Sequence, residues 1–213
     1  MRALAAVIVV IASGLVVAVQ TAAADEAQLG PSELVESAAR SMLDGLEANR
    51  AAYRKDPSQV GALVEKYLLP HFDIPYSARL VLGKHWRDAT PEQRERFATA
   101  FYHTLIDNYG SALADFTGDR LKVFPTKLEA ETDRATVRTE VMRDNGDRVP
   151  VSYSLRKTED GWKAWDVVIE GISYVKSFRE DFGAAIDQQG LDAVIERIEK
   201  NGSSAAAAKA GKQ

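Results

Sequence analysis

The residues best suited to acid–base chemistry in this sequence are three histidines and the carboxylates near them. His71, His85 and His103 do not pair with one another at the spacing of a metal-binding motif. His71 lies two residues before Asp73, a spacing that allows a general base and the carboxylate that orients it. Because this pair falls at an expected helix–loop junction, we favour local capping and hydrogen bonding. We therefore expect no catalytic residue and no metal ligand.

Asp166 interrupts an apolar run beside Trp165. A buried carboxyl at this position would have a raised pKa and would be a candidate acid. The interpretation we favour places Asp166 on the outward face of a half-buried strand. The sequence contains no G-x-S-x-G motif, no P-loop and no dinucleotide-binding glycine pattern, so its motifs do not favour an enzyme.

Composition excludes several further classes of protein. The chain of 213 residues has no cysteine, which excludes disulfides, thiolate catalysis and cysteine metal sites. It is 46% hydrophobic and 27% charged with a net charge of -4, which is ordinary for one globular domain. No long basic run is present, so we expect no nucleic-acid partner.

The N-terminus has the pattern of a secretory signal peptide. Arg2 precedes an uncharged apolar run at residues 3–19, and Ala22 and Ala24 form an A-x-A pattern before Asp25. We expect a signal peptide at residues 1–24, cleaved on export, then one domain at residues 25–200 and a flexible tail at 201–213. The alternative is an uncleaved membrane anchor, because the apolar run approaches spanning length.

Apolar periodicity predicts the order of the elements. Helical spacing indicates helices near residues 31–46, 57–69, 75–82 and 90–115, the last with a capping box at Thr90 and Gln93. After Gly118 the period changes to two, which predicts three or four strands ending at Ile169. Gly171 is expected to end the sheet, and helices then resume. The fold class is α+β: an antiparallel meander sheet of about four strands packed against N- and C-terminal helices.

Three segments of the chain resemble the MlaC family, also called the toluene-tolerance or Ttg2-type auxiliary proteins. The first runs from His71-Phe72-Asp73 to Phe101, the second has the sequence WKAWDVVIEGIS at residues 162–173, and the third begins at Gly190. The order and spacing of these segments agree over nearly the whole exported chain. One departure is His85, where we expect an aromatic residue such as tyrosine.

This resemblance implies a soluble periplasmic phospholipid carrier that maintains the lipid asymmetry of the outer membrane. Such a carrier binds acyl chains in a cavity between sheet and helices, and a related branch implies a hopanoid as an alternative cargo. Its implied partners are an inner-membrane ABC transporter with an MCE-domain ring and an outer-membrane lipoprotein–porin complex. We expect a monomer with no cofactor other than the lipid it carries.

The expected cavity has two walls and one closed end. The helix wall comprises Leu80, Phe97, Phe101, Leu105 and Tyr109. The sheet wall comprises Val137, Val141, Val151, Tyr153 and Leu155. Val167, Ile169 and Ile172 close an end, and the Glu170–Gly171 junction is expected to let the C-terminal helices shift. Periodicity does not distinguish a lined cavity from a filled core, so a closed core remains the alternative for each of these residues.

Two other classes of function remain open from the sequence. One is an enzyme or small-ligand sensor on an α+β scaffold, with His71, Asp73 and Asp166 as its candidate residues. The other is an interaction module of a membrane complex that binds no ligand. The identity of a co-purifying molecule distinguishes these classes from a lipid carrier.

Overall fold

The computed structural model describes residues 29–56, 59–113, 116–126, 128, 132–143 and 145–201, with side chains except at 54, 107–120 and 201. The expected signal peptide and nearly all of the expected tail lie outside these residues, so both stay predictions. No helix within the described ranges is long and apolar enough to cross a membrane.

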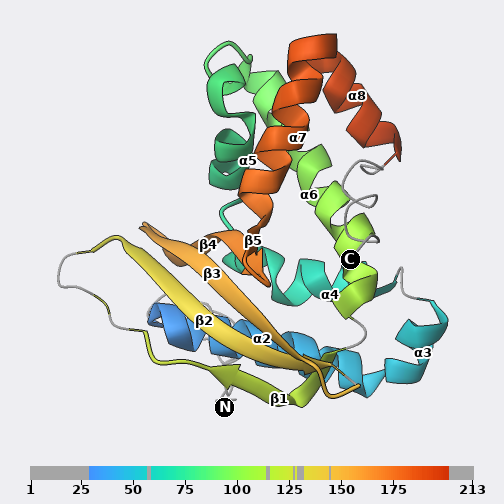
Figure 1. The fold of residues 1–213 in the computed structure, drawn as a ribbon, viewed down its shortest axis with the longest axis vertical. Coiled ribbons are helices and arrows are strands. Elements are labelled where there is room, and N and C mark those ends of the chain that lie inside the picture. Colours follow the sequence, from blue (N-terminus) through green and yellow to red (C-terminus); the bar gives the residue numbers. More distant parts are fainter. Residues whose placement is uncertain are drawn as a thin grey trace, which may run out of the picture.

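Helices form the first half of the described chain (Figure 1). They are α2 (Pro31–Ala48), α3 (Arg50–Lys55), α4 (Val60–Tyr67), η2 (Leu69–His71), α5 (Ile74–Leu82), η3 (Gly83–Trp86) and α6 (Pro91–Leu113). The expected capping box is present at the start of α6, where the Gln93 amide donates to Thr90 Oγ1 at 3.2 Å and the Thr90 amide to Gln93 Oε1 at 2.9 Å. Local sequence therefore determines where this helix begins.

The sheet is an antiparallel meander in the order β1-β2-β3-β4-β5, as expected. Its strands are β1 (Phe116–Val123), β2 (Arg134–Arg143), β3 (Arg148–Thr158), β4 (Gly161–Ile169) and β5 (Ile172–Ser173). Two details differ from the sequence-based expectation. β1 begins before Gly118, and Gly171 does not end the sheet. Glu170 and Gly171 have φ angles of +51° and +84°, as a two-residue hairpin turn requires, and β5 follows them.

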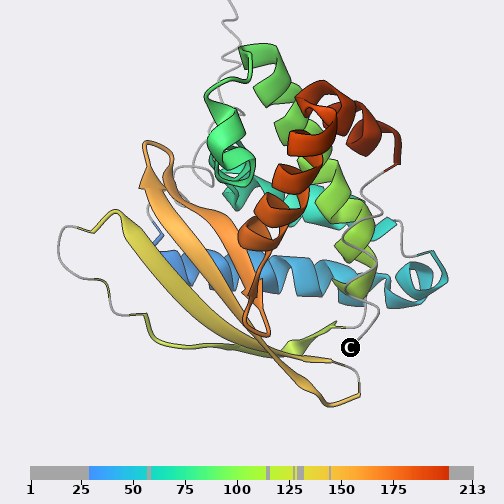
Figure 2. The ribbon, with the colours of Figure 1, turned by 45° about the horizontal axis from the view of Figure 1, so that its top comes forward.

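Two further helices complete the fold, α7 (Tyr174–Gln189) and α8 (Leu191–Asn201). α2 packs against β1 and β2, whereas α5 and α7 contact β4. Figure 2 shows α2 running along the sheet, with the group of α5, α6, α7 and α8 to one side of it. The sheet thus has one face toward α2, and part of its other face meets the start of α7.

The helices α5 to α8 have a hydrophobic core of their own. Its buried members include Val81, Phe97, Phe101, Phe182 and Ile195. Separate clusters lie between α2 and the sheet and between α2 and α4. The interior is therefore divided into several apolar clusters rather than one.

Candidate functional site

One face of the sheet is apolar across its width, and we call it the inner face. Strand register places Val137 opposite Tyr153, Val141 opposite Val149 and Leu155 opposite Ala164. Because directly opposed residues share a face, their side chains form rows across the strands. All eight sheet residues expected at the lipid site lie on this face, namely Val137, Val141, Val151, Tyr153, Leu155, Val167, Ile169 and Ile172.

The inner face has two parts with different neighbours. Toward one end, Val137, Leu155 and Ala164 pack against Leu34 and Val35 of α2. Toward the other end lies a second cluster, which we call the strand cluster. It comprises Leu121, Val141, Val149, Val151, Tyr153, Val167 and Ile169. Among the side chains that the structure describes, every member of the strand cluster comes from a strand, so this is the part of the face best suited to an apolar ligand.

Among the described side chains of the inner face, two carry hydroxyl groups, and both are paired. The Thr139 hydroxyl donates to the Val151 carbonyl oxygen at 3.1 Å. Burial raises the pKa of Tyr153 to about 12, and a hydrogen bond with the Thr139 side chain opposes this shift. Tyr153 therefore stays neutral at physiological pH, and the described side chains of the strand cluster carry no charge.

The helix wall expected from the sequence does not face the sheet. Phe97 and Phe101 of α6 pack against Phe178 and Phe182 of α7, with ring centroids 5.5 Å apart for Phe97–Phe182 and 5.3 Å for Phe101–Phe178. Both α6 residues are at most 1% exposed. α7 repeats phenylalanine at a spacing of four, as α6 does, and the two aromatic stripes meet edge to face. Leu105 packs against the same helical core.

The other two residues of the expected helix wall, Leu80 and Tyr109, do not add a described wall to the site. Leu80 of α5 is half-buried. Tyr109 belongs to α6, but its side chain lies outside the described part of the structure. The structure therefore brings together the sheet residues of the expected site and separates them from Phe97 and Phe101.

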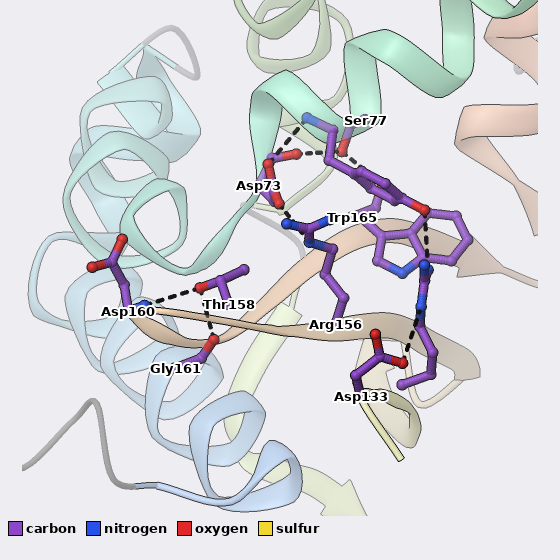
Figure 3. A network of polar contacts seen from close by, with 10 residues as sticks. Asp73, Ser77, Asp133, Arg156, Thr158, Asp160, Gly161 and Trp165 are labelled. Atoms are coloured by element: carbon purple, nitrogen blue, oxygen red, sulfur yellow. Dashed lines mark hydrogen bonds and ion pairs between the residues drawn. The ribbon is translucent and has the colours of Figure 1, made fainter. Parts of the chain in front are cut away.

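Asp73 has a structural role at the start of α5 (Figure 3). Its Oδ1 accepts a hydrogen bond from the Tyr76 amide at 3.0 Å, which caps the helix. Its Oδ2 lies 2.9 Å from Nε of Arg156, and the Arg156 guanidinium lies 4.5 Å from the centre of the Tyr76 ring. The capping role favoured from the sequence is thus confirmed for Asp73.

A solvent-open hollow of about 820 Å³ lies beside this network. Its lining mixes both signs of charge. It includes Asp73, Arg156, Lys157, Glu159, Asp160 and Lys163. Asp73 and Arg156 already pair with each other, and Lys163 Nζ donates to the Pro70 carbonyl oxygen at 2.6 Å. A hollow of this composition does not suit a hydrocarbon chain.

Asp166 lies on the face of the sheet opposite the inner face, as expected from the sequence, because it pairs with Ser154; at 6% exposed it is nevertheless buried and not open to solvent. Its Oδ2 accepts a hydrogen bond from the Ser173 hydroxyl at 2.6 Å, and its Oδ1 accepts one from the Val175 amide at 3.0 Å. The start of α7 folds back over β4 and covers the carboxylate. Asp166 therefore anchors α7 to the sheet.

The histidines do not assemble a reactive centre with these carboxylates. His71 is half-buried in η2, and His85 Nε2 of η3 lies 3.4 Å from Asp187 Oδ1 in the last turn of α7. Within the described residues, no three histidine or acidic side chains are grouped as a metal site would require.

Comparison with known proteins agrees with this fold and with the motifs. A family model described as MlaC protein matches residues 36–200. The chain belongs to the MlaC protein family. The toluene tolerance protein ttg2D of Pseudomonas putida is 32% identical over 163 residues, which cover 76% of this chain and 75% of that protein.

Two more distant relatives of this MlaC family chain carry lipid-related names. The intermembrane phospholipid transport system binding protein MlaC of Haemophilus influenzae is 24% identical over 83% of this chain and 84% of its own length. A solved phospholipid-binding protein from Ralstonia solanacearum, in complex with a phospholipid, has a TM-score of 0.74 and 24% identity. That match covers 82% of this chain and 97% of the other, and it establishes the shared fold.

Sequence reasoning missed some members of the inner face. Val149 alternates with Val151 and so has the same signal, yet it was not among the expected site residues. Leu121 was not found because the β1–β2 register shifts between Phe116 and Leu121, which interrupts the alternation. Membership of the MlaC family thus indicates the class of protein, whereas the strand register shows which residues share the inner face of the sheet.

Proposed function

We propose that this protein is a soluble periplasmic phospholipid carrier that binds acyl chains on the inner face of its sheet. The observation that carries the proposal is the strand cluster, in which seven apolar or aromatic side chains share one face with no charge among them. The names of the relatives support phospholipid as the ligand. Following the family resemblance, the carrier operates between an inner-membrane ABC transporter with an MCE-domain ring and an outer-membrane lipoprotein–porin complex.

Loading a lipid on this face requires movement. Val141, Val149 and Val151 are 7%, 1% and 5% exposed, so hydrocarbon reaches them only if neighbouring elements shift. The sheet is contacted by α2 on the inner face and by α7 near β4. Displacement of α2 or of neighbouring segments from the strand cluster would expose a continuous apolar surface.

Release of the lipid also requires a partner. A phospholipid carries roughly thirty methylenes, and burying each is worth about 0.8 kcal/mol, or about 25 kcal/mol before costs. Net non-covalent affinity saturates at about 18 to 21 kcal/mol, so burial on this scale already supports very tight binding. Escape into water is therefore slow, and the lipid acceptor is a docked membrane complex that offers another apolar environment.

The test is to express the full chain in a Gram-negative bacterium and to purify it from the periplasm. Intact mass should show an N-terminus at Asp25, and native mass spectrometry with organic extraction should show one bound phospholipid. A hopanoid would change the cargo, a polar metabolite would indicate a sensor or enzyme, and an empty protein would indicate an interaction module. The last two results contradict the proposal.

Two neighbouring valines of β4 provide a matched pair of variants. Val167 belongs to the strand cluster, whereas Val168 alternates to the opposite face, where it pairs with Ser152. A carboxylate placed against hydrocarbon costs several kcal/mol. Val167→Glu should retain less than about a tenth of the lipid of the wild type, and Val168→Glu should retain most of it. Equal lipid content in both folded variants would exclude the inner face as the site.

A further inference from the structure

A single row of side chains crosses all five strands on the inner face. Each member lies directly opposite the next in the strand register. The row is Val123, Thr139, Val151, Ile169 and Ile172. Four strand-to-strand steps of about 4.8 Å give it a length of about 19 Å, comparable with an extended acyl chain. Directly opposed residues point to the same side, so the row is one surface.

Exposure to solvent along this row is high at Ile172 in β5 and low in the middle of the sheet. Thr139 is 2% exposed, Val151 is 5% exposed and Ile169 is partly buried, whereas Ile172 is 52% exposed. The Thr139 hydroxyl donates to the Val151 carbonyl oxygen, so no unpaired donor interrupts the row. The row therefore connects solvent at the β5 edge with the buried strand cluster through apolar side chains.

The short strand β5, which carries Ile172, is anchored by the residue that follows Ile172. Ser173, the next residue, donates its hydroxyl to the buried Asp166 carboxylate and caps α7. The turn before Ile172 includes Glu170 at φ +51°, a left-handed conformation that is unfavourable for glutamate. The fold thus keeps Ile172 directly opposite Ile169 despite a strained turn.

We infer that the β5 edge is the portal for the lipid, and that one acyl chain enters at Ile172 and lies across the strands along this row. The inference rests on the proposed function and adds a route and an orientation to it. An apolar side chain exposed by itself is common on protein surfaces. Ile172 differs because it continues a buried apolar row on the same face. The ligand that suits this row is therefore a hydrocarbon chain.

The first test measures the rate at which purified, delipidated protein takes up a fluorescent phospholipid from liposomes. Leu128 is the matched control, because it is 48% exposed and, with Ile172, makes up the strongly exposed large hydrophobic residues of the described chain. Ile172→Glu should load at least tenfold more slowly, since each chain must pass a carboxylate. Leu128→Glu should load at the wild-type rate, and Ile172→Ala should show a smaller decrease.

Equal loading rates for Ile172→Glu and Leu128→Glu, both folded by circular dichroism, would overturn the portal. A wild-type protein that binds no lipid would instead contradict the proposed function, so the two failures are distinguishable. A second measurement places a photoreactive amino acid at position 172 or 168. Crosslinking to the acyl chain is expected from 172 and not from 168, which lies on the opposite face. Absence of the crosslink at 172 in lipid-loaded protein would also overturn the inference.

Discussion

The carboxylate of Asp166 and the hydroxyl of Ser173 lie 2.6 Å apart and join the last long strand to the first turn of α7. The same hydroxyl accepts a hydrogen bond from the Lys176 amide at 3.1 Å and so caps the helix. The carboxylate also accepts from the Val175 amide. The buried Asp166 carboxylate therefore accepts hydrogen bonds from two donors at the point where the chain leaves the sheet.

We expect Asp166→Asn to lower the free energy of unfolding by about 1.5 to 3 kcal/mol, the value of a hydrogen bond to a charged group. An amide presents one oxygen instead of two, so one of the two donors loses its acceptor. Urea denaturation at neutral pH measures the change.

Asp160→Asn is the control for Asp166→Asn, because Asp160 is exposed in the β3–β4 turn. This control should change stability by less than about 0.5 kcal/mol. Equal stability of Asp166→Asn and the wild type would show that the anchor contributes nothing.

Local features of this fold were predictable from the sequence, because each depends on a few neighbouring residues. The capping box at Thr90, the alternation through β2 and β3 and the helix break at Gly190 all follow from such signals. Strand alternation also predicted the shared face of the five sheet-wall residues, Val137, Val141, Val151, Tyr153 and Leu155, which the register bears out. These parts of the site needed no knowledge of distant contacts.

The features that were missed depend on contacts between distant segments. The stripe through Phe97 and Phe101 has a clear period, but the period does not reveal that α7 would supply Phe178 and Phe182 as partners. Asp166 has the alternation of an outward residue and is nevertheless buried, because α7 covers it. A two-residue strand such as β5 is too short to produce a periodic signal.

Tyr153 should make stability depend on pH above about 10. Burial raises the pKa of Tyr153 to about 12 in the folded protein, above the ordinary value of 10.0. The stability linked to its neutral form is therefore complete below pH 10 and is lost as the pH rises through 12. The loss in free energy of unfolding is up to about 3 kcal/mol.

Urea unfolding at pH 9, 10 and 11 checks this dependence, with Tyr153→Phe as the comparison. The variant keeps the ring but has no ionisable hydroxyl, so its stability should fall less steeply over this range. Tyr102, whose pKa is also raised by burial, is present in both proteins and cancels in the difference. Parallel pH profiles would contradict the predicted role of Tyr153.

Glu170 is the described non-glycine residue with a positive φ, and the described residues give its exposed carboxylate no hydrogen-bond partner. Asn before Gly is preferred in a two-residue hairpin turn, because Asn tolerates the left-handed region. We expect Glu170→Asn to raise the free energy of unfolding by roughly 0.5 to 1 kcal/mol, as the turn strain is relieved. Glu159→Asn, in the β3–β4 turn without a positive φ, should give no such gain.

Thermal and urea denaturation measure the stability of both variants. Lipid loading of Glu170→Asn should equal that of the wild type, because Ile172 keeps its position opposite Ile169. A loss of stability would show that the Glu170 carboxylate makes a favourable interaction, and slower loading would show that it takes part in lipid capture.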